Sequence, residues 1–199
     1  MKKFNALLLI LLLSVGCSQE NASDKYAESI TSNDLKDLLS IYSSDDFEGR
    51  QTGQKGDRIA ANFLRDFYIT NQIEPAQNTV DYFQPYQLNL PGEMYTRNYS
   101  FPETLRGYDR YAEGENFVDT QNVASIIEGE IYPESYIIIT GHLDHVGIDG
   151  DEVYNGADDN GSGTVSILEI AQAFQEAVED GIRPKRSIVF LHVSGEEEG

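Results

Sequence analysis

The chain of 199 residues is poor in cysteine and in basic side chains, and it has no tryptophan. Its single cysteine, Cys17, excludes an internal disulfide, so stability has to come from packing or from bound metal. The 14 basic residues face 34 acidic ones, which gives a formal net charge of −20. Because such a surface repels nucleic acid, we expect no DNA or RNA partner. Most of the carboxylates are expected to serve solubility.

The composition also lacks the features of a disordered or fibrous chain. Hydrophobic residues make up 40% of the sequence and aromatic residues 11%. These proportions are typical of one globular α/β domain with a single core.

One short apolar run stands near the N-terminus, where two lysines precede residues 6–13. The run is too short to span a bilayer comfortably and is typical of an export signal. It ends in residues 14–17, Ser-Val-Gly-Cys, which resemble a bacterial lipobox although Leu is more usual where Ser14 stands. We therefore expect residues 1–17 to be a signal peptide with Cys17 as the lipidation site; a cleaved secretory signal is the alternative. The protein is then exported to the cell envelope as an outer-membrane or surface lipoprotein, or is otherwise periplasmic or secreted.

Beyond the signal, residues 18–25 are polar and aperiodic, which predicts a tether before a folded domain over residues 26–199. Leucines at helical spacing after the N-cap type Thr31 predict a helix that ends near Tyr42. A second helix is predicted over residues 56–71, where apolar side chains recur along one face. From residue 82 to 119 the pattern indicates only strands joined by long loops.

The C-terminal third has a clearer pattern. Residues 122–127 and 135–140 favour strands, and the second is nearly all β-branched, as a buried parallel strand would be. Apolar spacing from Val165 to Val178 predicts a helix, and residues 187–193 predict another buried strand. A strand, helix, strand order predicts parallel strands whose carboxyl ends meet at one edge of the sheet. Ligand chemistry is expected at that edge.

Candidate metal ligands follow each of these strands. His142 and Asp144 come after the first strand, where an imidazole can bind metal while a carboxylate orients the ring. Two adjacent carboxylates lie in the Gly-rich loop 156–163 before the helix. The alternatives to a metal site are an Asx turn that caps the helix and a calcium loop. The ligand pattern of an EF-hand calcium loop is absent. Three glutamates, residues 196–198, follow the second strand. Histidine, aspartate and glutamate at one edge together predict a zinc site.

Three motifs occur in order: GHLDHVG at 141–147, NGADDNGSG at 155–163 and FLHVSGEEEG at 190–199. Their succession resembles the co-catalytic di-zinc aminopeptidases, metallopeptidase family M28. The stretches DDFEGRQTGQKGDRIAANFL at 45–64 and YFQPY at 82–86 also resemble bacterial members. The resemblance implies a three-layer α/β sandwich in which helices flank a mostly parallel central sheet, as in zinc exopeptidases, here incomplete at the C-terminus.

The resemblance also implies roles for individual residues around two zinc ions. His142 would bind one zinc, Glu197 would bind the other, and Asp158 would bridge both. Asp144 would orient the metal site. Glu196 would be the general acid/base that takes a proton from the metal-activated water and passes it to the leaving amine.

The three consecutive glutamates leave the register open in principle. The family pattern Glu-Glu-x-Gly, with Gly199 after the run, assigns the two roles to Glu196 and Glu197 and leaves Glu198 variable. His145 is expected to be a loop histidine and His192 a core-strand histidine.

The expected activity is hydrolysis of N-terminal peptide bonds, so the expected partners are peptide substrates, and contact with a membrane is expected only through the anchor on Cys17. A carboxypeptidase or a glutaminyl cyclase on the same fold is the nearest alternative, and a non-catalytic binding module is another. Retained ligands argue against the binding module. In the family a second aspartate and a second histidine come from downstream segments, so we expect this chain to be truncated and inactive by itself.

Overall fold

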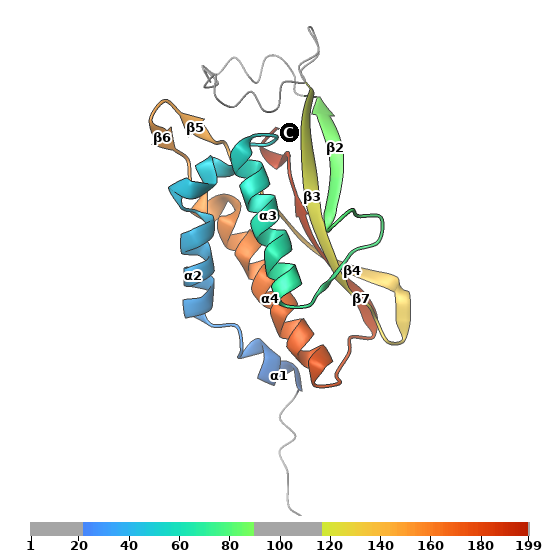
Figure 1. The fold of residues 1–199 in the computed structure, drawn as a ribbon. Helices are drawn as coiled ribbons and strands as arrows, with labels where there is room; N and C mark the ends of the chain where they lie inside the picture. Colours follow the sequence, from blue (N-terminus) through green and yellow to red (C-terminus); the bar gives the residue numbers. More distant parts are fainter. Residues whose placement is uncertain (1–21, 90–116, 199) are drawn as a thin grey trace, which may run out of the picture.

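A computed structural model describes residues 22–89 and 117–198 (Figure 1). The longer helices are α2 (Ser32–Tyr42), α3 (Lys55–Thr70) and α4 (Ser162–Glu179), and the shorter ones are α1 (Ala22–Ala27), η1 (Asp45–Arg50), η3 (Ala157–Gly161) and η4 (Glu196–Glu198). The strands are β1 (Glu74–Pro75), β2 (Phe83–Asn89), β3 (Phe117–Ile127), β4 (Tyr132–His142), β5 (Ile148–Asp149), β6 (Glu152–Val153) and β7 (Arg186–Val193).

The main sheet has five strands in the order β1-β3-β7-β4, with β2 paired to the remaining length of β3. Strands β4 and β7 are parallel, and α4 connects them along the chain. Strand β3 is antiparallel to β7, to β1 and to β2. The predicted β4-α4-β7 unit is therefore confirmed, and it brings the carboxyl ends of β4 and β7 to the same edge.

The prediction of a mostly parallel sheet is wrong for the described strands, because β4 and β7 form the one parallel pair among them. Antiparallel pairing needs no helical crossover between the strands, and β2 pairs with β3 in this way. The sheet is thus mixed, and the broader assignment to the α/β class is confirmed.

The helices lie together on one side of the sheet in Figure 1, where α3 and α4 cover it directly. Of the three layers expected, residues 22–89 and 117–198 contribute the sheet and this one helical layer. Strand β4 was predicted to be buried, yet Ile137 and Ile138 are 50% and 58% exposed. Within the described residues β4 pairs with β7 alone, which leaves its other edge open.

The core lies between the sheet and the helices. Leu64 of α3, Leu168 of α4 and Phe190 of β7 are fully buried in it. Burial of each such side chain stabilises the fold by roughly 2 kcal/mol relative to exposure. This packing fixes α3 and α4 against the strands that end at the candidate site.

The predicted helices are confirmed with small changes at their ends. Thr31 caps α2, because its hydroxyl accepts a hydrogen bond from the Asp34 backbone N–H at 3.2 Å. Helix α3 begins one residue before the predicted range, at Lys55. The predicted signal peptide and Cys17 lie outside the described residues. Helix α1 begins at Ala22, so residues 22–25 belong to a helix and not to the predicted tether.

Candidate metal centre

The site forms where β4 and β7 end. His142 is the last residue of β4 and lies opposite Val193, the last residue of β7. After β7 the chain turns at Gly195, whose φ of +88° is in the left-handed region that favours glycine. A Cβ atom on Gly195 would also lie 2.9 Å from Leu88 of β2. The turn brings the three glutamates of η4 back over the end of β4.

His142 presents one ring nitrogen to the acidic side chains. Its Nδ1 lies 3.1 Å from the backbone oxygen of Asp144. Because a carbonyl oxygen can only accept, Nδ1 donates this hydrogen bond, and Nε2 is the ring nitrogen that faces the carboxylates and could bind a metal. That Nε2 lies 3.1 Å from Oδ1 of Asp159 and 3.8 Å from Oε2 of Glu196. A cation bound to Nε2 would therefore lie next to both carboxylates.

Asp144 is fully buried and contacts both segments that carry candidate ligands. Its carboxylate accepts a hydrogen bond from Thr52 Oγ1 at 2.7 Å. It also accepts from the backbone N–H groups of Glu196 at 3.4 Å and Glu197 at 3.3 Å. One Asp144 oxygen is 3.6 Å from Nδ1 of His142. Asp144 therefore connects the histidine to the glutamate turn, in line with the orienting role that remains a prediction.

The two adjacent aspartates of the 156–163 loop do not take the predicted positions. Asp159, and not Asp158, faces His142. Asp158 is exposed and belongs to neither cluster of potential ligands found among the described residues. Neighbouring side chains in extended backbone point to opposite sides, and Asp159 has extended angles of φ −119° and ψ 94°. Only one of the pair could face the site, and the fold of the loop selects Asp159.

His145 is a second residue that the sequence reasoning missed. Its Nδ1 lies 2.8 Å from Oε1 of Glu197 and donates to that carboxylate when the carboxylate is ionised. The signal for it was its position in the same loop, three residues after His142. The Glu197 side chain is 19% exposed, whereas that of Glu196 is 59% exposed. The two neighbouring glutamates therefore differ in their access to solvent.

The donors fit zinc. His142, Glu196 and Glu197 form one cluster and His145, Asp159 and Glu197 form another, with ligand atoms within 4.8 Å of one another in each. Ligand atoms on one tetrahedral zinc lie about 3.4 Å apart, given bonds of about 2.1 Å. The 3.1 Å between Nε2 of His142 and Oδ1 of Asp159 is close to this value. Imidazole nitrogen and carboxylate oxygen are also ligands that zinc accepts in proteins.

A buried carboxylate supports the turn that carries the glutamates. Ser194, just before the turn, donates its hydroxyl to Oδ1 of Asp57 on α3 at 3.0 Å. The other Asp57 oxygen accepts from Thr120 Oγ1 at 2.8 Å and from the Gly53 backbone N–H at 3.0 Å. Burial raises the pKa of Asp57 to about 7. Tyr86 of β2 donates its hydroxyl to the backbone oxygen of Ser194, and burial raises its pKa to about 12.

His192 lies inside the core, as predicted. It is fully buried on β7, and its Nε2 is 2.7 Å from the hydroxyl of Tyr68. Burial lowers the pKa of His192 to about 3, so this histidine is neutral at physiological pH. It is separate from the ligand clusters and serves packing.

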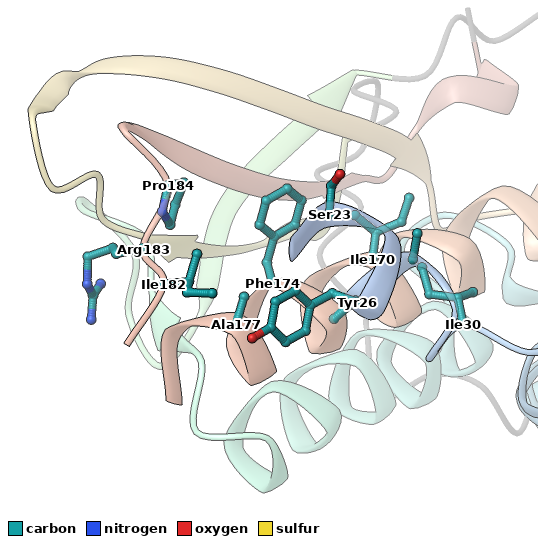
Figure 2. A pocket seen from close by; sticks show the side chains of 11 residues that line it. Ser23, Tyr26, Ile30, Ile170, Phe174, Ala177, Ile182, Arg183 and Pro184 are labelled. Atoms are coloured by element: carbon teal, nitrogen blue, oxygen red, sulfur yellow. The ribbon is translucent and has the colours of Figure 1, made fainter. Parts of the chain in front are cut away.

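An apolar pocket lies at the other end of α4, near the start of β7 (Figure 2). Figure 2 shows Tyr26 close to Phe174 and Ala177 of α4, and Ile30 also lines the pocket. Its described lining contains neither a carboxylate nor a histidine. It therefore offers none of the donors found at the ends of β4 and β7. Of the helices in residues 22–89 and 117–198, none is long and apolar enough to cross a membrane.

Solved structures share the arrangement of strands and helices. The LapA aminopeptidase of Legionella pneumophila superposes with a TM-score of 0.58 at 19% identity, covering 100% of this chain and 42% of its own. The glutaminyl cyclase of Macrostomum lignano superposes with a TM-score of 0.59 at 13% identity, covering 90% of this chain and 42% of the cyclase. The fold is therefore the one shared by these aminopeptidases and glutaminyl cyclases.

The sequence comparisons match part of the chain to one peptidase family. Residues 122–199 match the model of Peptidase family M28. The probable glutamate carboxypeptidase VP8 of Zea mays is 33% identical over 89 residues, which are 45% of this chain and 12% of the relative. Aminopeptidase NAALADL1 of Rattus norvegicus is 35% identical over 82 residues, 41% of this chain and 10% of the relative. The chain thus spans a small part of these relatives. Its match to peptidase family M28 covers residues 122–199, which include all the ligand candidates.

Proposed function

We propose that the full-length protein is a zinc-dependent exopeptidase that hydrolyses N-terminal peptide bonds. The observation that carries the proposal is the convergence of His142, Asp159, Glu196 and Glu197 at the ends of two parallel strands. These residues lie within the segment that matches the M28 family model. The match to a peptidase family supports peptides as the substrates.

We propose that the site holds two zinc ions. His142 would bind one ion, Glu197 would bind the other, and Asp159 would be shared, because it contacts Nε2 of His142 and also clusters with Glu197. This reassigns the bridging role from Asp158 to its neighbour. Bound zinc would lower the pKa of a water molecule and polarise the peptide carbonyl. These three ligands are too few for two ions, so residues 26–199 alone are proposed to be inactive.

Glu196 is the proposed general acid/base. Its carboxylate is the more exposed of the two glutamates and lies 3.8 Å from the nitrogen of His142 that faces the site. It can therefore reach both a water molecule and an incoming peptide. It would accept a proton from the water and donate it to the leaving amine, while Asp144 fixes the turn beneath it through two backbone N–H groups.

A Glu196→Gln variant of the full-length protein tests this role. The amide has the same shape but cannot accept the proton, so turnover should fall by at least about 100-fold while two zinc ions remain bound. Hydrolysis of aminoacyl anilides and zinc analysis of the purified protein measure the two effects. The matched control is Glu198→Gln, which should keep both zinc and activity. Near-normal turnover of Glu196→Gln would refute the assignment and would point to Glu198.

The names of the relatives favour two other activities on the same site, a carboxypeptidase and a glutaminyl cyclase. Three substrates separate them: an aminoacyl anilide, an N-acylated dipeptide with C-terminal glutamate, and a peptide with N-terminal glutamine. We expect activity on the first. Cleavage of the second alone would identify a carboxypeptidase, and ring closure of the third without hydrolysis would identify a cyclase.

A further inference from the structure

A fully buried arginine lies between the loops that carry the ligands, and the family model does not cover it. The guanidinium of Arg50 donates to four backbone carbonyls. Its Nε donates to Leu143 at 3.0 Å, and its Nη2 donates to Gly156 at 3.0 Å. Its Nη1 donates to Tyr42 at 3.1 Å and to Asn155 at 2.8 Å. One planar side chain therefore joins three segments of the chain.

Two of these segments carry the proposed zinc ligands. Leu143 directly follows His142, and Gly156 precedes Asp159 by three residues. Each hydrogen bond fixes a backbone oxygen at one end of a ligand-bearing loop relative to the rigid guanidinium plane. The distance between His142 and Asp159 depends on how these loops sit against each other. Arg50 is placed to set that distance.

The backbone around Arg50 is hydrogen-bonded to the loop 141–147. Glu48, Gly49 and Arg50 have φ values of 49°, 63° and 53°, in the left-handed region that disfavours Glu and Arg. The loop contacts them directly, since the His145 N–H donates to the Arg50 oxygen at 3.1 Å and the Gly147 N–H donates to the Gly49 oxygen at 3.0 Å. Such strained conformations persist where the surroundings determine them, and they concentrate at functional sites.

The charge of Arg50 also acts on the site. Burial lowers the pKa of the guanidinium, whereas Tyr42 and the charges on Asp144, Glu197 and Asp159 raise it. These carboxylates therefore attract the guanidinium, although its hydrogen bonds are to backbone oxygens. In a cluster of negative groups a fixed cation offsets part of their mutual repulsion.

We propose that Arg50 is a positioning residue that holds the loops 141–147 and 155–163 at the separation zinc requires, before the metal binds. This inference rests on the zinc site of the proposed function. Lysine would keep the charge, but a single ammonium group cannot reach four carbonyls in a plane. The role therefore depends on the several N–H donors of the guanidinium as well as on its charge.

The test compares Arg50→Lys with Arg65→Lys in the full-length protein. Arg65 lies on α3 and pairs with Asp66 at 2.7 Å and Asp81 at 3.4 Å. Its replacement therefore controls for the general effect of changing an arginine to lysine. Zinc affinity is measured by competition with a chelator, and the site is probed by the visible spectrum of bound Co²⁺. Arg50→Lys should weaken zinc binding by about 10- to 100-fold and alter the Co²⁺ spectrum. Arg65→Lys should change neither.

The outcomes separate this inference from the proposed function. Wild-type affinity and an unchanged Co²⁺ spectrum in Arg50→Lys would overturn the positioning role, even if the variant unfolded at a lower temperature. A wild-type protein that bound no zinc would overturn the proposed function and this inference with it. If Arg50→Lys does not fold, Tyr42→Phe replaces it, because its hydroxyl donates to the same Leu143 oxygen at 2.9 Å. That variant should lose about fivefold in zinc affinity, and an unchanged affinity would refute the role.

Discussion

Replacing Asp57 by Asn should make the folded protein less sensitive to rising pH. Asp57 is completely buried and accepts hydrogen bonds from Gly53, Thr120 and Ser194. The amide has nearly the same shape, so its oxygen can keep the bonds from Gly53 and Thr120 while its nitrogen faces the Ser194 hydroxyl. The substitution therefore removes the ionisation of the side chain and keeps most of the packing.

The magnitude follows from the pKa. Burial raises the pKa of Asp57 from 3.8 to about 7, so the folded state binds more protons than the unfolded state between these values. The contribution to stability is thus fully present below pH 3.8 and is lost as pH rises through 7. A shift of about 3 pH units corresponds to about 4 kcal/mol, of which about 3 kcal/mol falls between pH 5 and pH 8. The Asn variant should gain this amount relative to wild type over that range.

Urea unfolding of the zinc-free full-length protein at pH 5, 6, 7 and 8 measures the effect, and removal of zinc avoids the pH dependence of metal binding. The quantity to compare is the difference in unfolding free energy between Asp57→Asn and wild type at each pH. Asp37→Asn, on the exposed side of α2, controls for the loss of one carboxylate. A difference that stays constant from pH 5 to pH 8 would show that Asp57 does not titrate as its burial requires.

The adjacent aspartates and the predicted lipid anchor provide the remaining predictions. Asp159→Asn should weaken zinc binding by more than about 100-fold, since it loses a ligand, whereas Asp158→Asn should bind zinc as wild type does. Chelator competition measures both, and the reverse order would restore Asp158 as the bridging residue. Cys17→Ala should release the protein from membranes into the soluble fraction, because the anchor would be lost. Membrane association that persists in this variant would exclude Cys17 as the lipidation site.

Much of the fold could be predicted because its signals are local. The spacing of leucines after Thr31 and of apolar residues in 165–178 follows the helical period, and both helices are present. The order of strand, helix and strand placed His142 and the glutamates at one edge, because parallel strands point their carboxyl ends the same way. The antiparallel pairing of β2 could not be predicted, since residues 82–119 have no clean periodicity.

Within the site, the sequence by itself determined the residue types and the loops that bring them together: a histidine after β4, aspartates before α4 and glutamates after β7. Only the tertiary structure decided which of two adjacent aspartates faces His142, because that choice depends on backbone angles in one irregular turn. The tertiary structure also placed His145 and Arg50 in contact with the site. His145 contacts Glu197, 52 positions away, and Arg50 contacts Leu143, 93 positions away. Local sequence patterns cannot predict contacts between residues so far apart in the chain.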